Sequence, residues 1–583
     1  MPAGDSGEKA SRLEEVLLLV ALGFYAIGLP MCGAIFRPGF AAYDEESFLD
    51  QIQAWREGHP LILRFGLGSL YRGLGVLLVQ AGGPHLFLLR LPALAAVLAE
   101  ACLLYFWLRD KIGERGALWA ALADLVCTAT FARGASLLAA SLMPAAFLLG
   151  VVACERLRRP WQSALWGLAV GFMLLDYEGW AGALLFLVPY AAWLWRERPG
   201  LRPAAAFGLV AAGTLVLGLS PDLLKHIQAR GALSSPDAGF ISQAWTNLRL
   251  LLSRGDRMAI SAAANQPWPS PWIWPLLVLG AWPAFRRFPW LAWLLACGSL
   301  ALGLVDTNFE PHRLCLALLA LGACAGAGAS LLWKSRWGRV LCLALLAWGA
   351  SSEIRAWNSM SAAKLQLTYA SSVELEQSAL WLAQHQPAGG WDVISGLGSH
   401  DDGAFRFLLD QAGVEAHGKT PVALIYWDYQ PGLKALAPGR AVVLGDYQPV
   451  LLFLPQAKDA ARLDAVSASL RGLRWALVSQ SPSVVQRLDA LWLQAKDPAH
   501  QDPWARTVVW EQWLFSSLLL RKVDLDGVEQ MLKEPMVCGW APDVLAKELQ
   551  PSNPALAQRL REKAEAIDPR RKAMSQEQRI ARY

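Results

Sequence analysis

Long apolar runs separated by short charged loops fill the first 355 residues of the chain. An α-helix of about 20 apolar residues crosses the roughly 30 Å hydrocarbon core of a bilayer. Runs that reach or approach this length lie at about 16–35, 86–108, 117–132, 137–154, 162–175, 179–195, 203–220, 271–285, 289–305, 313–333 and 338–354. The pattern predicts a mainly α, polytopic membrane protein with about 11 transmembrane helices.

The loops between these runs alternate in charge. Basic residues are gathered in every second loop, at 109–115, 156–159, 196–202, 286–287 and 334–339. The intervening loops carry the acidic residues at 44–46, 176–178 and 306–310. Because positively charged loops stay in the cytoplasm, we expect a protein of the cytoplasmic membrane. Its N-terminus is then cytoplasmic, and everything after about residue 356 is extracytoplasmic.

Two segments on the predicted outer side are amphipathic and not apolar throughout. The stretch 61–80 lies in the first outer loop, at about 37–85, and contains Arg64, Arg72 and four glycines. We interpret it as interfacial or re-entrant. The second outer loop, at about 221–270, contains a stretch with helical apolar spacing at 241–252. We expect this helix to lie along the membrane surface.

Beyond residue 356 the apolar runs shorten to four to six residues and alternate with helical patterns. Short runs lie at 391–395, 422–426, 441–444 and 450–454, and helical patterns at 371–386, 402–414, 457–473 and 482–494. This alternation is typical of a soluble α/β domain. The predicted organisation is a transmembrane domain at 1–355, an α/β domain at 356–500 and a helical extension at 501–583.

Composition supports the membrane class and excludes others. The chain is 55% hydrophobic and 17% charged, whereas soluble domains are about 25% charged. Its 28 Trp also suit membrane–water interfaces. A net charge of +5 is too small to indicate nucleic-acid binding. Eight of the nine cysteines fall inside apolar runs, so they indicate buried thiols and no disulfide framework.

An acidic segment, Asp44-Glu45-Glu46, follows the first apolar run. Phe48, Ile52 and Trp55 recur at helical spacing after it, so the carboxylates open an amphipathic helix that we expect to lie along the outer membrane interface. Asp44 can cap this helix, and the neighbouring acids favour its positive end. The same carboxylates could serve as a general base or a metal ligand for a lipid-borne substrate. The two roles are compatible.

The acidic segment is the first of an ordered set of short motifs. It is followed by Glu57–Pro60, by Leu89–Ala93 and, after a basic loop, by Ala132–Ala135. This set resembles the GT-C superfamily of membrane glycosyltransferases, notably the protein mannosyltransferase and aminoarabinose transferase branch, over roughly residues 15–350. The chain departs from many relatives at 136–139, where it lacks an acidic residue, and at Glu178, where others have lysine.

The resemblance implies a polyprenyl-phosphate sugar donor and a role for each matching residue. Asp44 would deprotonate or orient the acceptor, with Glu45 assisting. If a divalent cation (Mg²⁺ or Mn²⁺) takes part, one of these two carboxylates is its expected ligand. The donor phosphate would be held by outward-facing cations. We expect these to be Arg72, Arg133, His312 and Arg313.

Arg133 is the strongest of these candidates because its surroundings, residues 128–142, contain no other charge. An unpaired charge inside a membrane costs about 3 kcal/mol, so Arg133 should have a partner or a ligand. Asp124 lies in the same predicted span but more than two turns away, which is too far for a direct helical pair.

A further resemblance lies in the predicted α/β domain. Trp427-Asp428-Tyr429, at the end of an apolar strand pattern, is similar to the Trp-Trp-Asp-Tyr motif of oligosaccharyltransferases. It departs from that motif at Tyr426 and Gln430. The resemblance implies that these residues bind the acceptor. The alternative is a strand that ends in an aromatic turn.

Together these features predict a GT-C glycosyltransferase that moves a hexose or pentose from a polyprenyl-phosphate donor to a protein, lipid or glycan acceptor on the outer face. One alternative is an oligosaccharyltransferase-like enzyme that transfers a preassembled glycan. Others are a transporter or flippase for lipid-linked sugars, and a GT-C scaffold that binds lipid without catalysis. No nucleotide-binding loop or Cys/His metal motif is present in the sequence.

Overall fold

The computed structural model describes residues 12–28, 44–58, 69–127, 130, 133, 141–156, 159–175, 180–197, 213, 239–254, 268–304, 314–361, 373–395, 401–416, 418, 420–426, 441–444, 450–453, 510, 513–514, 523–536, 538–574 and 579. The chain divides into two compact units. The first contains Met1–Arg37 and Leu63–Ala370, and the second contains Pro38–Ile62 and Ser371–Tyr583.

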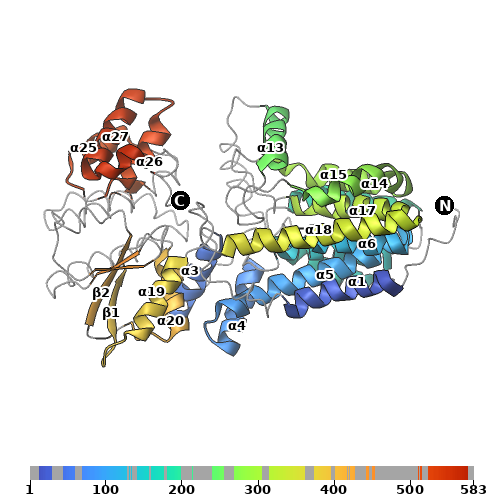
Figure 1. Ribbon diagram of the computed structural model, residues 1–583, viewed down its shortest axis with the longest axis horizontal. Helices are drawn as coiled ribbons and strands as arrows, with labels where there is room; N and C mark the ends of the chain where they lie inside the picture. The colour runs from blue at the N-terminus through green and yellow to red at the C-terminus, as the bar shows by residue number, and fades with distance from the viewer. Residues whose placement is uncertain are drawn as a thin grey trace. The chain divides into compact units, whose positions relative to one another are not determined.

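The described part of the first unit is helical (Figure 1). Its elements are α1 (Arg12–Gly23), the π-helical turn η1 (Phe24–Gly28), α4 (Ser69–Gly82), α5 (Leu86–Ile112), α6 (Glu114–Leu125), α8 (Leu142–Arg156), α9 (Pro160–Leu175), α10 (Trp180–Glu197), α13 (Phe240–Arg254), the 3₁₀ turn η3 (Pro271–Ile273), α14 (Trp274–Arg287), α15 (Trp290–Gly298), α16 (Ala301–Leu304), α17 (Cys315–Leu332) and α18 (Arg336–Ser361).

Helices occupy the predicted apolar runs, apart from 203–220, of which only residue 213 is described. The helix in the run 117–132 is shorter than predicted, because α6 ends at Leu125. Two of the described helices, α5 and α17, are long and apolar enough to cross a membrane. The count of about 11 spans stays a prediction.

Helix α17 lies at the centre of this bundle because its residues are small. It packs on α6 and α14, and nearly all of it is buried. A Cβ atom placed on Gly326 would lie 2.1 Å from the carbonyl oxygen of Gly116 in α6. One placed on Gly328 would lie 2.1 Å from the carbonyl oxygen of Leu276 in α14. Small residues allow this approach, which is typical of helix pairs in membranes.

Large apolar side chains also point away from the bundle. Val278 and Trp282 of α14 are each 75% exposed, and Trp337 of α18 is 81% exposed. Helices α1 and α9 carry similar exposed side chains, including Leu19 and Trp161. Large apolar side chains exposed in this number are unfavourable in water. Their exposure therefore supports contact between the bundle and lipid.

Buried and half-buried carboxylates join the helices near the basic loops. Glu155 of α8 accepts hydrogen bonds from Lys111 Nζ (2.9 Å), Trp107 Nε1 (3.2 Å) and the Tyr190 hydroxyl. Glu14 of α1 is paired with Arg115 of α6, with 3.0 Å between Oε1 and Nε. These pairs fix α5, α8 and α10 together, and α1 to α6.

The second unit contains a four-stranded sheet with helices packed beside it. Its elements are α3 (Asp44–Arg56), α19 (Val373–Gln384), β1 (Trp391–Ser395), α20 (Asp401–Ala412), β2 (Thr420–Tyr426), β3 (Ala441–Leu444), β4 (Val450–Phe453), α25 (Leu525–Lys533), α26 (Trp540–Leu549), α27 (Pro554–Ile567) and the 3₁₀ turn η7 (Pro569–Ala573). The strands fall on the four short apolar runs seen in the sequence, in the order β1-β2-β4-β3. β1 and β2 are parallel and are joined through α20, whereas β4 is antiparallel to both of its neighbours.

The acidic segment of the first outer loop belongs to this second unit. It forms α3, as the helical spacing predicted, and α3 packs on α20. Phe48 and Ile52, whose spacing suggested a membrane-facing stripe, are buried. The interfacial placement of this stripe was wrong for these two residues, because protein covers them.

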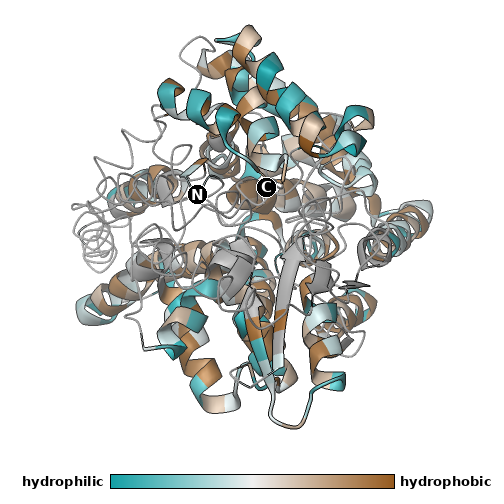
Figure 2. Cartoon of the chain, turned by 90° about the vertical axis from the view of Figure 1, so that its left-hand side faces the viewer, coloured by the Kyte–Doolittle hydropathy of each residue, from teal (hydrophilic) through white to brown (hydrophobic). Residues whose placement is uncertain are grey.

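The helices α25, α26 and α27 form a small amphipathic module. Hydrophilic and hydrophobic residues alternate along them (Figure 2). Their apolar residues include Val528, Met531, Leu545 and Leu560, all of which are fully buried. Lys563 of α27 donates to the carbonyl oxygens of Leu532 (3.0 Å) and Glu534 (2.7 Å), so it caps the end of α25.

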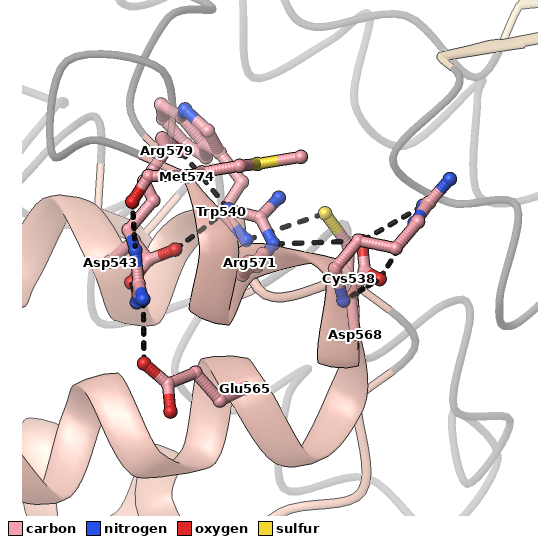
Figure 3. Close-up of polar contacts among 9 residues, drawn as sticks. Cys538, Trp540, Asp543, Glu565, Asp568, Arg571, Met574 and Arg579 are labelled. Carbon is pink, nitrogen blue, oxygen red and sulfur yellow. Dashed lines mark hydrogen bonds and ion pairs between the residues drawn. The ribbon is translucent and has the colours of Figure 1, made fainter.

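Charged side chains close the C-terminal end of this module (Figure 3). Buried Arg571 donates to Asp543 Oδ2 (2.7 Å), and Arg579 bonds both Asp543 (3.3 Å) and Glu565 (2.6 Å). Burial raises the pKa of Asp543, although Arg571 and Arg579 oppose this effect. Burial also disfavours the charge of Asp568, but its bonds from Arg570 outweigh burial and lower the pKa of Asp568.

We expect Gly326→Ala to destabilise the helix bundle, because its methyl group would overlap the backbone of α6. Overpacking of this kind costs about 1–3 kcal/mol. The free energy of unfolding in mixed micelles measures the loss. Gly73→Ala in α4 is the matched control, since a Cβ there meets nothing within 4 Å. Equal stabilities of the two variants would contradict the close approach of α17 and α6.

We expect Asp568→Asn to loosen the C-terminal module at neutral pH but not in acid. A carboxylate with a lowered pKa stabilises the fold above its unfolded pKa of about 3.9, and this contribution disappears as the pH falls through the folded pKa. Asparagine keeps the cap bond to the Arg570 amide and removes the charge. Because Arg570 is partly exposed, the expected loss at pH 7 is about 1 kcal/mol.

Reaction of buried Cys538 with a dipyridyl disulfide, followed in the full chain by peptide mass spectrometry, measures this loosening. About 1 kcal/mol corresponds to roughly fivefold faster labelling at pH 7. The ratio should approach one as the pH falls through the lowered pKa of Asp568. Asp526→Asn, at an exposed position in α25, should leave the rate unchanged. A ratio independent of pH would exclude the charge of Asp568 as the cause.

Candidate functional site

The partner of Arg133 is Glu100, which lies on the neighbouring helix α5. Arg133 Nη1 donates to Glu100 Oε2 (2.8 Å), and Nη2 donates to Oε1 (3.0 Å). Both side chains are completely buried. Two parallel bonds between a guanidinium and a carboxylate are the strong geometry for such a pair. Arg133 is thus neutralised within the first unit.

Two further polar side chains complete this buried cluster. Thr130 Oγ1 accepts a bond from Arg133 Nη2 (3.1 Å) and donates to Asp124 Oδ1 (3.3 Å). The sequence spacing had excluded a direct contact between Asp124 and Arg133, and Thr130 links them. Among the described residues, Arg133 Nε and Asp124 Oδ2 have no hydrogen-bond partner. Arg133 has five N–H donors, and the described bonds use three of them. The remaining donors suit a group that accepts a hydrogen bond, such as a hydroxyl or a water molecule.

The cluster lies deep in the bundle. Helices α5 and α6 are joined by a turn at Gly113, close to the basic residues 109–115. Asp124 lies 11 residues after Gly113 and Glu100 lies 13 residues before it, and each residue of a helix advances 1.5 Å. The two carboxyls are therefore about 16–20 Å from this turn. That distance is more than half the thickness of a hydrocarbon core of about 30 Å.

Helix α4 carries another of the predicted phosphate-binding residues. Arg72 lies in its first turns and is buried. Its neighbour Tyr71 donates to the carbonyl oxygen of Leu89 (2.9 Å), so α4 is attached to α5 beside the Leu89–Ala93 motif. Arg90 in this motif is buried as well.

The predicted catalytic carboxylates stand at the beginning of α3. Asp44 is the first residue of that helix and Glu45 the second. The positive end of the helix macrodipole favours negative charge at both positions. The side chains of Asp44 and Glu45 are outside the described part of the chain. Glu57 and Gly58, at the start of the second motif, directly follow α3.

The other predicted site residues lie outside the described residues. These are His312, Arg313, Trp427, Asp428 and Tyr429. The described residues contain no group of three or more His, Cys, Asp and Glu side chains that could hold a metal ion. A metal site at Asp44 or Glu45 therefore stays a prediction.

Glu100 is a residue that the sequence analysis missed. Its signal is simple: it is the one acidic residue in the apolar run 86–108. A charge in such a run requires an internal partner. Arg133, 33 residues later, is the charge that satisfies it.

No protein-family model matches the sequence, and none of the curated proteins matches it. Solved structures are similar at low sequence identity. ArnT from Cupriavidus metallidurans bound to undecaprenyl phosphate is 13% identical, with a TM-score of 0.49 over 76% of this chain and 98% of that one. The archaeal oligosaccharyltransferase AglB from Archaeoglobus fulgidus, in complex with an inhibitory peptide and a dolichol-phosphate, is 11% identical, with a TM-score of 0.41 over 88% of this chain and 86% of that one.

ArnT is an aminoarabinose transferase, and both proteins belong to the GT-C superfamily. At these identities and scores, function has to be inferred from the residues of this chain.

We expect Glu100→Leu to destabilise the first unit by about 3–5 kcal/mol, because it leaves the buried guanidinium of Arg133 without its counter-charge. The double variant Glu100→Leu with Arg133→Leu should recover a large part of this loss. Unfolding in mixed micelles gives the coupling energy of the pair. Glu114→Gln, at the loop end of α6, should change stability by less than about 1 kcal/mol. Strictly additive losses in the double variant would refute the coupling.

Proposed function

We propose that this protein is a membrane glycosyltransferase that uses a polyprenyl-phosphate-linked sugar and an acceptor on the outer face of the membrane. One observation carries the proposal. The helix that begins with Asp44-Glu45 belongs to the same compact unit as strand β2, and β2 ends at Tyr426, directly before the Trp427-Asp428-Tyr429 segment. The proposed base and the proposed acceptor-binding motif are thus parts of one structural unit.

The proposed reaction requires a base on the acceptor side. Asp44 accepts the proton of the acceptor hydroxyl while the hydroxyl oxygen attacks the anomeric carbon of the sugar. The bond between that carbon and the phosphate oxygen breaks, and the polyprenyl phosphate leaves with the bonding electrons. In-line attack inverts the anomeric centre. The positive end of the helix macrodipole favours a negative charge at this position.

The donor side requires cations for the leaving phosphate. Arg72, His312 and Arg313 are assigned to this task, together with Arg133. Glu100 and Thr130 take three of the five N–H donors of Arg133, so fewer of its donors remain for a ligand. We therefore assign the direct phosphate contacts mainly to Arg72, His312 and Arg313.

The second candidate function is transfer of a preassembled glycan from a pyrophosphate-linked donor. Its support is the Trp427-Asp428-Tyr429 segment, which is similar to an oligosaccharyltransferase motif. The mass added to the acceptor separates the two functions, because one transfers a single sugar and the other a chain. A flippase would move lipid-linked sugar across liposomes and leave the acceptor unmodified.

We expect Asp44→Asn to lower turnover by about a hundredfold or more, since general base catalysis contributes that much or more to rate. Purified protein would be given polyprenyl-phosphate hexoses and pentoses labelled in the sugar, with membrane extract as the source of acceptors. Release of free polyprenyl phosphate and labelling of the acceptor are both measured.

Glu46→Gln is the matched control, because it removes a neighbouring charge from the same helix end. It should retain most of the activity. Near-wild-type turnover of Asp44→Asn would remove Asp44 from the mechanism. Chelation with EDTA, followed by addition of Mg²⁺ or Mn²⁺, tests whether a cation takes part.

A further inference from the structure

A polar cluster joins the last turn of α3 to the last turn of α20 within the second unit. Asp410 Oδ2 accepts a bond from Gln53 Nε2 (3.3 Å) and is also paired with Arg56 Nη1. Gln53 in turn accepts from Arg56 Nη1 (3.0 Å) and donates to Glu57 Oε1 (3.2 Å). Arg56 and Asp410 are 27% and 35% exposed. Their attraction is therefore only partly screened by solvent.

The position of Asp410 is unfavourable for α20 itself. The helix ends directly after it, with Gly413 at a φ of +73° and its amide bonded to the Asp410 carbonyl. A negative charge in the last turn opposes the helix macrodipole. The last turn of α3 adds a second negative helix end and Glu57. Arg56 is a cation that offsets these charges from the neighbouring helix, so the cluster favours contact between the two helix ends.

Apolar packing extends this contact along the helices. Leu49 and Ile52 of α3 are fully buried, and so are Phe405 and Leu408 of α20. The two helices have 13 and 12 residues and pack against each other. Because their last turns are bonded and their middle turns are buried, we infer that they run side by side in the same direction. Their first residues, Asp44 and Asp401, then lie toward the same end of the pair.

The position of the sheet shows where the first residues of α3 and α20 lie. Helix α20 follows β1 and leads into β2, and these two strands are parallel. The carboxyl ends of β1 and β2 therefore lie at one edge, to which the first turn of α20 is connected. β2 ends there at Tyr426. In open α/β sheets, ligands bind outside the carboxyl ends of the strands.

We propose that Asp410 is a positioning residue. Through Gln53 and Arg56 it sets how far α3 extends past this edge of the sheet, and this fixes the position of Asp44 relative to a bound acceptor. Asp44 is 12 residues from Arg56, which corresponds to about 18 Å along the helix. A small rotation at the bonded end is magnified over that length. The inference rests on the proposed function, because it assigns the cluster to the placement of the base.

Asp410→Asn in the full chain tests the proposal. Asparagine keeps the shape of the side chain and removes the charge that Arg56 requires. Turnover of labelled polyprenyl-phosphate sugar should fall roughly 10- to 100-fold, the size of effect that a misplacement of about 1 Å produces. The KM for the donor should stay within about twofold. The charge exchange Arg56→Asp with Asp410→Arg should restore much of the turnover.

Hydrogen exchange supplies a readout that does not need enzyme activity. Amides of residues 49–56 should exchange faster in Asp410→Asn, and the charge-exchanged variant should reverse this. Glu529→Gln is the matched control, because it removes the carboxylate of an exposed ion pair with Arg559 (2.6 Å) elsewhere in the unit. It should alter neither turnover nor exchange in α3.

The outcomes separate the two proposals. If no preparation transfers sugar, wild type included, the proposed function fails, and the exchange data still decide whether the cluster holds α3. Faster exchange with unchanged turnover would overturn the positioning role. Unchanged exchange in Asp410→Asn would overturn the cluster itself. An equal loss of turnover in Glu529→Gln would mean that the loss in Asp410→Asn is a general effect of removing a charge, and it would overturn the positioning role.

Discussion

The need to neutralise buried charge inside the protein determines how the helices of the first unit are joined. Arg133 is fully buried and can remain so only because Glu100 supplies a bidentate counter-charge from α5. The same requirement is met nearer the basic loops, where Glu14 pairs with Arg115 and Glu155 with Lys111. Each pair joins two helices, and loss of either partner would leave a charge unpaired inside the protein. The apolar contacts bring the helices together, and these pairs select their rotation and register.

The sequence predicted the helices well and their partners poorly. Hydrophobic runs located α5, α17 and α18, and short β-rich runs located the four strands, because both signals are local. The partner of Arg133 lies 33 residues away on another helix, and no periodicity reports such a pairing. Helix α6 was also predicted too long. The apolar run continues past Leu125, and hydrophobic spacing does not report where a helix ends inside such a run.

Helix α3 illustrates the same limit at the candidate site. Its spacing correctly predicted an amphipathic helix that begins at Asp44, but an apolar stripe does not reveal what covers it. The cover is α20, about 350 residues later in the chain, together with an ion pair to Asp410. A membrane surface and a protein surface attract the same stripe. Only the polar residues between the apolar ones, Gln53 and Arg56, distinguish them, because they need a specific partner.

These two results change the assignment of roles in the proposed enzyme. The guanidinium of Arg133 gives two of its N–H donors to Glu100 and one to Thr130, and its charge is already paired, so Arg133 is better suited to shape the site than to carry the phosphate alone. In the proposed enzyme, we therefore assign the charge of the leaving phosphate mainly to Arg72, His312 and Arg313.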